Sequence, residues 1–379
     1  MAFVKRRIKF LTLVTAGLLL LSGLAFSFFV SSPRQAAHAS GSQGFYQQTN
    51  LVSDLAGLAQ ITDPSLVNAW GLVHGPTTPW WVADNGTGVS TLYNTMSATV
   101  VKVPLTVTIP APAGSPAGTT SAPTGVIFNG DGGFNVSQNG QSFSSLFIFD
   151  TEDGTISGWN PTFPDRSHAV LAVDRSNVGK GAVYKGLAIG TNSSGTFLFA
   201  TNFRFGTIEM FDSNFHLVRS FTDHRLPQSY APFGIQNIGG DLYVTFAKQD
   251  AKKHDDVAGP GHGFVDVFDT NGHLIRRLIA RGSLNSPWGL ALAPASFGQF
   301  SNDLLVGNFG DGRINVFDPT TGAALGSLQN SAGVPIQIDG LWSLQFGNDA
   351  AAGASNELFF TAGIDGEAHG LFGDIQSES

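Results

Sequence analysis

Cysteine is absent from the 379-residue chain. Its absence excludes disulfide bonds, thiolate metal sites, a cysteine nucleophile and a lipid anchor on an N-terminal cysteine. Charged residues are also scarce at 13%, whereas hydrophobic residues make up 42% and the chain holds 47 Gly and 31 Phe. Such an apolar and weakly charged composition excludes a disordered chain and indicates a globular protein.

Basic residues are few beyond the N-terminal segment. Residues 1–39 hold five of the 20 Lys and Arg and none of the 28 Asp and Glu, so residues 40–379 carry a net charge of −13. Binding to nucleic acid phosphates needs clustered Lys and Arg. We therefore expect no nucleic acid partner.

The N-terminal segment has the features of a targeting sequence. A basic cluster at residues 5–9 precedes an uncharged apolar stretch from Phe10 to Val30, and the small residues of "AHAS" follow at 37–40. This pattern predicts a signal peptide over residues 1–39, cleaved after Ala39, and hence a secreted, extracellular or cell-envelope protein. The 21-residue stretch could also span a bilayer, and membrane contact is expected only if it stays uncleaved.

A short unit recurs along the rest of the chain, where no helical periodicity is found. Each copy has an apolar strand, a polar Gly-rich turn and an alternating strand that often ends in Phe-Asp, as in "TFLFATNFRFGTIEMFD" (196–212). This is a hairpin pattern. A short marker precedes each copy: "NAWGL", "APTGV", "YKGLA", "APFGI", "SPWGL" and "IDGLW". Its glycines are Gly71, Gly125, Gly186, Gly234, Gly289 and Gly340.

Six units of about fifty residues predict an all-β fold, a single six-bladed β-propeller over residues 40–379 with four-stranded blades. The sixth unit lacks an outer strand, and "FYQQTNLVSD" (45–54) has strand character. We expect this N-terminal strand to complete the last blade and close the ring. The expected blades cover approximately 64–105, 122–173, 183–222, 230–280, 286–329 and 338–375 plus 45–54.

One copy, "NDLLVGNFGDGRINVFDPTTG" (302–322), raises a choice between a ligand loop and a turn. No helix follows to offer its N-terminus to a phosphate. Glycine with Asn and Asp is typical of tight turns. The turn interpretation is therefore preferred. Propeller geometry gathers such turns, with the connections that enter each innermost strand, on one face, where binding groups are commonly found.

An insertion in the fourth unit carries several potential metal ligands. "AKQDAKKHDDVAGPGHG" (247–263) brings carboxylates and imidazoles together, and oxygens in the other turns could surround a cation at the channel mouth. Neither an HExxH nor an EF-hand spacing is present, and a solvated insertion is the plainer alternative. The candidate ligands for Ca²⁺ or another divalent cation are Asp84, Asn85, Asp250, His254, Asp255, Asp256, His262 and Asp339.

Other residues of the same face are candidates for direct ligand contact. The indole rings could stack on a ligand such as a sugar, although inter-blade packing explains them more simply. The carboxylates could act as acid and base, although they more commonly cap turns. The candidates are Asn68, Trp70, Glu152, Asp153, Asn202, Lys248, Trp288, Asn308, Trp342, Asp365 and His369.

The chain resembles six-bladed propellers built from NHL-like repeats. It is more closely similar to a family of uncharacterised secreted bacterial proteins, some of which end in a PEP-CTERM sorting tail. The segments that carry this resemblance are "NAWGL" (68–72), "FDTEDGTISGWNP" (149–161) and "FAKQDAKKHDDVAGPGHGFVDVFD" (246–269). The resemblance implies a six-bladed fold and export, with no established activity. The chain ends in "GDIQSES", so sorting through such a tail is not expected.

A looser likeness exists to calcium-dependent lactonases of gluconolactonase type. Asn68, Asn285 and Asp339 could stand in for their metal ligands, but the inner-strand Glu of those enzymes has no counterpart here. Fold likeness alone does not transfer activity. Three functions therefore stay open. They are a module that binds a small molecule, glycan or protein, a divalent-metal-dependent hydrolase of lactonase type, and a structural envelope protein. The sequence assigns no catalytic residue and no definite cofactor.

Overall fold

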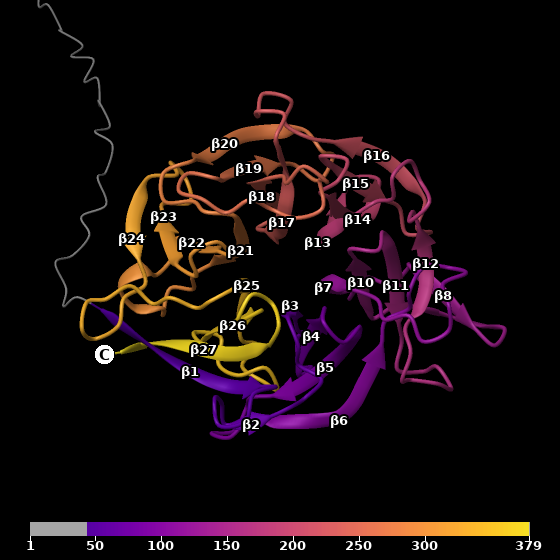
Figure 1. The fold of residues 1–379 in the computed structure, drawn as a ribbon, viewed down its shortest axis with the longest axis horizontal. Coiled ribbons are helices and arrows are strands. Elements are labelled where there is room, and N and C mark those ends of the chain that lie inside the picture. The colour runs from indigo at the N-terminus through magenta and orange to yellow at the C-terminus, as the bar shows by residue number, and fades with distance from the viewer. Residues whose placement is uncertain (1–43, 379) are drawn as a thin grey trace, which may run out of the picture. The chain divides into compact units, whose positions relative to one another are not determined.

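The computed structural model describes residues 44–378, which form six main sheets around a central axis, antiparallel apart from one short parallel pair (Figure 1). Within this part of the chain the one helical element is a 3₁₀ turn, η1 (Gly298–Phe300). The predicted all-β, six-bladed propeller is therefore confirmed. None of the described helical segments is long and apolar enough to cross a membrane. The predicted signal peptide lies outside the described residues.

Blades one to five each contain four strands, which run outward from the axis in chain order. Blade one consists of β3 (Ala69–Val73), β4 (Trp80–Asp84), β5 (Val89–Asn94) and β6 (Val101–Thr108). Blade two consists of β7 (Pro123–Phe128), β10 (Phe147–Thr151), β11 (Thr155–Trp159) and β12 (Val170–Asp174). A separate hairpin of β8 (Asn135–Gln138) and β9 (Gln141–Ser144) lies between β7 and β10 in the chain. The repeat pattern of the sequence does not predict this hairpin.

The next three blades follow the same plan. Blade three consists of β13 (Tyr184–Asn192), β14 (Gly195–Asn202), β15 (Thr207–Phe211) and β16 (Leu217–Phe221). Blade four consists of β17 (Tyr230–Ile238), β18 (Asp241–Lys248), β19 (Phe264–Phe268) and β20 (Leu274–Ala280). Blade five consists of β21 (Pro287–Leu292), β22 (Leu304–Asn308), β23 (Ile314–Phe317) and β24 (Ala324–Ser327).

Blade six joins segments from the two ends of the described chain. Its strands are β25 (Leu341–Phe346), β26 (Leu358–Ala362) and β27 (Leu371–Glu378), with β1 (Phe45–Ser53) antiparallel to β27. The register pairs Phe45 with Glu378 and Ser53 with Leu371. The predicted closure by an N-terminal strand is confirmed, and a two-residue strand, β2 (Ile61–Thr62), adds a fifth strand in parallel to β1.

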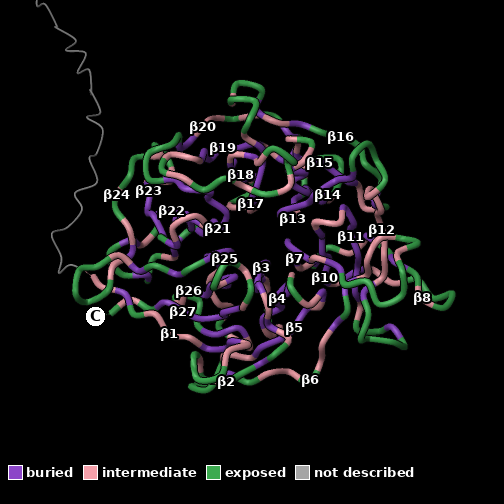
Figure 2. Tube along the Cα trace, in the orientation of Figure 1, coloured by how far each residue is buried: buried purple, intermediate pink, exposed green. Residues whose placement is uncertain are grey.

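The hydrophobic core lies between neighbouring blades. Figure 2 shows buried residues along the inner strands and exposed residues in the outer strands and loops. Aromatic rings fill the gaps between sheets. Trp81 of blade one stacks on Phe147 of blade two with ring centroids 4.0 Å apart. The abundant Phe thus supplies the large apolar surfaces that face-to-face sheets need.

The marker glycines lie where inner strands of adjacent blades come closest. A Cβ atom on Gly71 would lie 2.3 Å from the carbonyl oxygen of Thr124, and one on Gly234 would lie 2.1 Å from that of Trp288. No larger side chain fits without a backbone shift. This close approach explains why glycine recurs at this position in five blades.

The sixth marker glycine was assigned incorrectly. In blade six Leu341 pairs with Ala362 and Leu344 with Phe360, the register that Ala69 and Leu72 have in blade one. The equivalent of Gly71 is therefore Ser343, whereas Gly340 lies in the turn before β25 with a φ of 60°. Because this turn glycine lies only three residues before Ser343, the repeat pattern aligns on Gly340 instead of on Ser343.

The "GNFGDG" segment is a turn between β22 and β23. The Asn308 side-chain amide donates to Asp311 Oδ1 at 3.0 Å, and the Gly312 amide donates to the Asn308 carbonyl, also at 3.0 Å. Gly312 has a φ of 69°, in the left-handed region that glycine adopts without strain. The turn interpretation of this segment is therefore confirmed.

Candidate functional site

Six residues, one per blade, surround the axis at the position just before the marker glycine or its serine equivalent. We call them the axial ring. They are Trp70, Thr124, Lys185, Phe233, Trp288 and Trp342. All are buried, and four are aromatic.

The aromatic members of the axial ring pack on one another. Trp70 stacks on Trp342 with centroids 3.7 Å apart, and Trp288 meets Trp342 edge-on at 6.0 Å. Trp70 and Trp342 are each only 1% exposed. The three indoles suggested as stacking platforms for a ligand are therefore occupied in inter-blade packing. Phe309, half-buried, stacks on Trp342 at 4.1 Å and extends this cluster toward the surface.

Lys185 is the charged member of the axial ring. Its ammonium donates to Glu152 Oε1 and, at 3.3 Å, to Asp255 Oδ1, and lies 5.0 Å from the centre of the Trp70 ring. Burial alone would lower the pKa of Lys185, but the charges of Glu152 and Asp255 outweigh it and raise the pKa. Lys185 is thus a buried ammonium held by two carboxylates and an indole face.

A chain of polar contacts continues from Lys185 across the loop face. The Asn85 side-chain amide donates to Glu152 Oε2 at 2.9 Å. The Asn68 side-chain amide donates to Asn85 Oδ1 at 3.2 Å and to Glu367 Oε2 at 2.8 Å. Asn68 Oδ1 accepts from the Trp342 indole at 3.0 Å. Turns of blades six, one and two therefore meet the inner strand of blade three, as expected for loops that share a face.

The insertion of blade four folds toward the same place. Asp250 Oδ1 accepts from the His254 amide at 2.8 Å, and the Gly259 amide donates to Asn285 Oδ1 at 2.6 Å. Its Asp255 contacts Lys185 while the Asp255 side chain stays 65% exposed. A hydrogen bond from the His254 ring, and then the charge of Lys185, hold the pKa of Asp255 well below its usual range. The insertion thus covers the axial ring on one side.

Glu152, His254 and Asp255 have the geometry of a potential metal site. Their ligand atoms lie within 4.8 Å of one another, and within residues 44–378 no other trio of His, Asp or Glu meets that criterion. The ammonium of Lys185, however, already contacts both carboxylates. A divalent cation about 4 Å from that ammonium would be repelled by about 8 kcal/mol at an effective dielectric constant of about 20. The three residues therefore fit a divalent cation poorly while Lys185 is charged.

The other candidate metal ligands lie in local structures. Asp84 is fully buried, its Oδ2 accepts from the Thr91 amide and hydroxyl, and burial raises its pKa well above the usual value. Asp339 Oδ2 accepts from the Asp365 amide at 2.7 Å. The His262 ring lies 2.8 Å from the Val257 carbonyl. Asp256 is half-buried, and burial raises its pKa. The structure does not bring these four residues into one shell.

The remaining candidates of the ligand face are spread around the rim. Asn202 at the end of β14 donates to Glu209 of β15 at 3.1 Å. Asn308 at the end of β22 donates at 2.8 Å to the carbonyl of Ser283, in the connection between β20 and β21. Asp153 Oδ2 accepts from the Ala122 amide at 2.8 Å.

Three further candidates lie at the edges of this face. The His369 ring lies 2.7 Å from Asp54 Oδ2, at the seam between β27 and the segment after β1. Lys248 ends β18 half-buried, and Asp365 is exposed. The His369 carbonyl accepts from the Asn68 amide at 3.3 Å, but within residues 44–378 no side-chain hydrogen bond or ion pair joins these three residues to the network around Lys185.

Two central residues, Lys185 and Glu367, were absent from the candidates drawn from the sequence. A signal for Lys185 existed, because the residue before the marker glycine is Trp in blades one and five, Phe in blade four and Lys only in "YKGLA". Glu367 carries no such signal, since it is one of several acidic residues in a turn. Its place in the network becomes visible only in the structure, where it accepts a hydrogen bond from the Asn68 side-chain amide.

The network has an excess of negative charge. Glu152 and Asp255 contact one ammonium, that of Lys185, and Glu367 is joined to Glu152 through Asn68 and Asn85. Burial raises the pKa of Glu367, and the charges of Glu152 and Asp255 raise it further. The three carboxylates are therefore close enough to sense one another, and a site of this kind attracts a positively charged group.

Comparisons with known proteins place the fold in context. No model of a known protein family matches the chain. The uncharacterized protein R648 of Acanthamoeba polyphaga mimivirus is 34% identical over 333 residues, which cover 86% of this chain and 78% of R648. The uncharacterized protein L690 of the same virus is 34% identical over 332 residues, which cover 86% of this chain and 84% of L690.

Among solved structures, a streptogramin B lyase superposes with a TM-score of 0.51 at 12% sequence identity, over 88% of this chain and 98% of that chain. At this identity the likeness concerns the fold alone. The expected resemblance to six-bladed propellers is supported. The relatives at the sequence level are viral proteins, and membership of a bacterial secreted family stays a prediction.

Proposed function

The chain belongs to the same family as the mimivirus proteins R648 and L690, and we propose that it is a binding module for a small organic cation. The proposed site is the axial mouth of the loop face, around Glu152, Asp255 and Glu367. One observation carries the proposal: Glu152 and Asp255 contact the single ammonium of Lys185, and a third carboxylate, Glu367, lies close enough to sense their charges.

The surroundings of Lys185 illustrate how such a cation would be held. Two carboxylates and an indole face bind its ammonium. Next to it, Glu367 accepts one hydrogen bond from Asn68, and the half-buried Phe309 adds an aromatic surface through its stacking on Trp342. A ligand ammonium or guanidinium between Glu367 and Asp255 would find the same combination of carboxylate and aromatic groups.

We further propose that the protein acts outside the cytoplasm, in the extracellular space or the cell envelope. The basic cluster, the apolar stretch and "AHAS" within residues 1–40 support this location. The absence of cysteine removes any dependence on disulfide formation there. Fractionation of a full-length tagged chain, with N-terminal sequencing of the exported form, tests it. A mature N-terminus at Ser40 in the exported fraction is expected, and retention inside the cell would contradict it.

Titration calorimetry with spermidine tests the binding function. Saturable binding to the full chain is expected, and Glu367→Gln should weaken it about tenfold, since one charge-assisted contact contributes roughly 1.4 kcal/mol. Asp365→Asn is the matched control, because Asp365 is an exposed carboxylate in the same turn that lies outside the network. Equal weakening by both variants would reduce the effect to general surface charge. No saturable binding of spermidine, arginine or choline would refute the proposal.

A metal-dependent hydrolase of lactonase type is the second candidate, favoured by the spacing of Glu152, His254 and Asp255. Metal analysis of protein purified without chelator, with a lactone hydrolysis screen, tests it. Lys185→Met sharpens this test, since removal of the ammonium should strengthen divalent cation binding if the trio is a metal site. A stoichiometric divalent ion in the unmodified protein would favour the hydrolase over the cation-binding module. A protein that binds neither cations nor metals and hydrolyses nothing would fit the structural role.

A further inference from the structure

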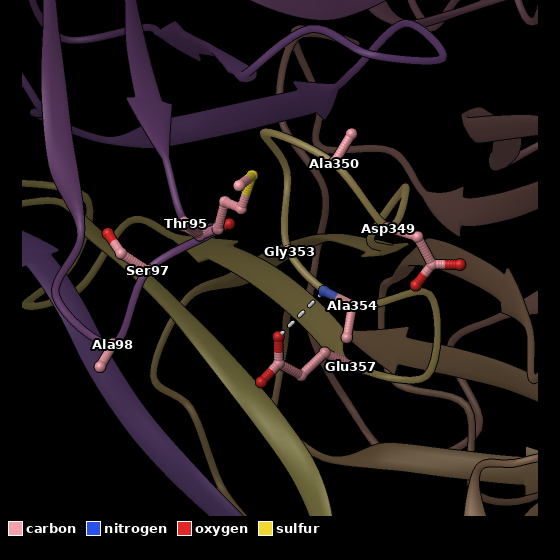
Figure 3. A pocket seen from close by; sticks show the side chains of 9 residues that line it. Thr95, Ser97, Ala98, Asp349, Ala350, Gly353, Ala354 and Glu357 are labelled. Carbon is pink, nitrogen blue, oxygen red and sulfur yellow. Dashed lines mark hydrogen bonds between the residues drawn. The ribbon is translucent and has the colours of Figure 1, made fainter.

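Two adjoining cavities lie at the seam between blade one and blade six, away from the axial network. The first, of about 420 Å³, opens between the turn at residues 95–98 and the loop at residues 349–357 (Figure 3). The second, of about 230 Å³, extends from it toward β1 and β27. Thr95, Ser97, Ala98 and Glu357 line both, so the two cavities adjoin, and we call them together the seam cleft.

Asp374 lies at the inner end of the seam cleft. It belongs to β27, where it pairs with Thr49 of β1 and Phe359 of β26, and it is only 6% exposed. Its Oδ1 atom is buried and has no hydrogen-bond partner among the described residues. A buried polar atom without a partner costs about 1–3 kcal/mol. A ligand hydroxyl in the cleft would satisfy it.

Glu357 supplies a second carboxyl group to the same cleft. Its Oε2 accepts from the Ala354 amide at 3.3 Å, the contact drawn in Figure 3, and its Oε1 accepts from the Gln376 side chain. Burial, with the nearby charge of Glu357, raises the pKa of Asp374 to about 7. Near neutral pH Asp374 therefore exists in both forms, and its carboxyl group can donate or accept a hydrogen bond.

The rest of the inner lining is mainly polar, because its apolar residues are each at most 5% exposed. Thr49, Gln60 and Ser97 offer hydroxyl and amide groups, whereas Leu51, Val100 and Phe359 are apolar. A sugar suits such a lining, since its ring hydroxyls can both donate and accept hydrogen bonds. A divalent cation would instead require several ionised oxygens, and the cleft has two carboxyl groups, one of them partly protonated.

We propose that the seam cleft is a carbohydrate-binding site that accepts one or two sugar units. Asp374 and Glu357 would hydrogen-bond ring hydroxyls, and Thr49, Gln60 and Ser97 would offer further hydrogen-bonding groups. The volume of the cleft suits a ligand of this size. The site is separate from the axial mouth and independent of the proposed cation-binding function.

Ligand-detected saturation-transfer NMR on the full chain tests this proposal, with glucose, galactose, mannose, N-acetylglucosamine and maltose as probes. Ala98→Trp should close the mouth of the cleft and reduce affinity at least tenfold. Ala98 is exposed in a surface turn, so the variant should fold. Thr99→Trp is the matched control, because Thr99 is exposed in the same turn and lines neither cavity.

Asp374→Asn is a second variant, which tests the same site through a change inside the cleft. It should weaken sugar binding without loss of fold, since the amide replaces a carboxyl group of nearly the same shape. Saturable binding of a probe that falls in Ala98→Trp and Asp374→Asn but not in Thr99→Trp supports the site. Absence of binding for all five probes, or equal binding by Ala98→Trp and the unmodified chain, overturns the proposal. Calcium binding lost in Asp374→Asn, with no sugar binding, overturns it in favour of a cation site.

Discussion

Lys185 of blade three and Glu152 of blade two form an ion pair beside the axis of the propeller, with the Lys185 side chain 3% exposed and that of Glu152 13% exposed. The pair belongs to blades two and three, and its hydrogen-bonded neighbours extend the contact to blades one, four and six. The pair therefore does more than join two side chains. Through Lys185 the inner strand of blade three contacts turns of blades two and four.

We predict that Lys185→Met lowers the free energy of unfolding by about 3–5 kcal/mol, because Glu152 would be left buried without its cation. Urea denaturation followed by circular dichroism measures this. Lys248→Met, at a half-buried lysine on the same face, should change it by less than about 1 kcal/mol. The double variant Lys185→Met with Glu152→Gln should recover part of the loss, and failure to do so would argue against the ion pair as the cause.

We predict that the protein is more stable at pH 5 than at pH 8. The pKa values of Asp150, Asp266 and Asp374 are raised to about 7, first of all by burial. The folded state binds these protons more tightly than the unfolded state, so their contribution is complete below about pH 4 and is lost as the pH rises through 7.

Carboxylates with lowered pKa values, such as Asp63 beside Lys102, act in the opposite sense, and their contribution is lost only as the pH falls below about 4. Thermal unfolding at constant ionic strength should therefore give its highest Tm between about pH 4 and 6. Asp374→Asn should reduce the fall in Tm between pH 5 and 8. A Tm that rises across that interval would contradict the prediction.

We predict that Gly234→Ala costs about 3 kcal/mol, because the added Cβ would lie 2.1 Å from the Trp288 carbonyl oxygen and force neighbouring inner strands apart. The same experiment offers a natural counterpart in blade six. Ser343→Gly restores glycine at the equivalent position and should cost no more than about 1 kcal/mol. The urea unfolding midpoints of the two variants and of the unmodified protein measure these two losses of stability. Similar midpoints for both would show that the close approach relaxes freely.

We predict that Tyr46→Ala destabilises the protein by about 3–5 kcal/mol through the loss of a buried ring at the closure. Tyr46 is 1% exposed, packs against Phe297 and Phe300, and its hydroxyl donates to the Phe297 carbonyl at 3.0 Å. Tyr46→Phe keeps the ring and removes the two hydrogen bonds of the hydroxyl, the second of which it accepts from the Phe300 amide at 3.3 Å. This variant should therefore cost about 1–2 kcal/mol. Equal losses for the two variants would assign the effect to the hydroxyl instead of the ring.

The fold was predictable because propeller blades repeat. Each copy reports the same hairpin, and the missing outer strand of the sixth unit pointed to residues 45–54, which the structure pairs with β27. The error at Gly340 had a local origin. A turn glycine three residues before Ser343 resembled the marker, and only the strand register separates the two.

The candidate site was less predictable, because its residues are distant in sequence and meet only when the ring closes. The loop face was expected, and Glu152, Asn85 and Asn68 do form contacts there. The role of Lys185 could not be predicted, because its partners Glu152 and Asp255 are distant in sequence and reach it only in the folded protein. The seam cleft was hidden for a similar reason, since Asp374 meets Thr49 through pairing between the two ends of the described chain.

The way blade six is assembled also bears on how the protein is made. Its strands β1 and β27 are separated by more than three hundred residues, so β1 lacks its antiparallel partner while the ribosome adds nearly all the rest of the chain. Blades one to five can form during translation, but the ring cannot close until residues 371–378 have emerged from the ribosome. A chain exported before that point would cross the membrane with blade six incomplete, and the propeller would close only after export.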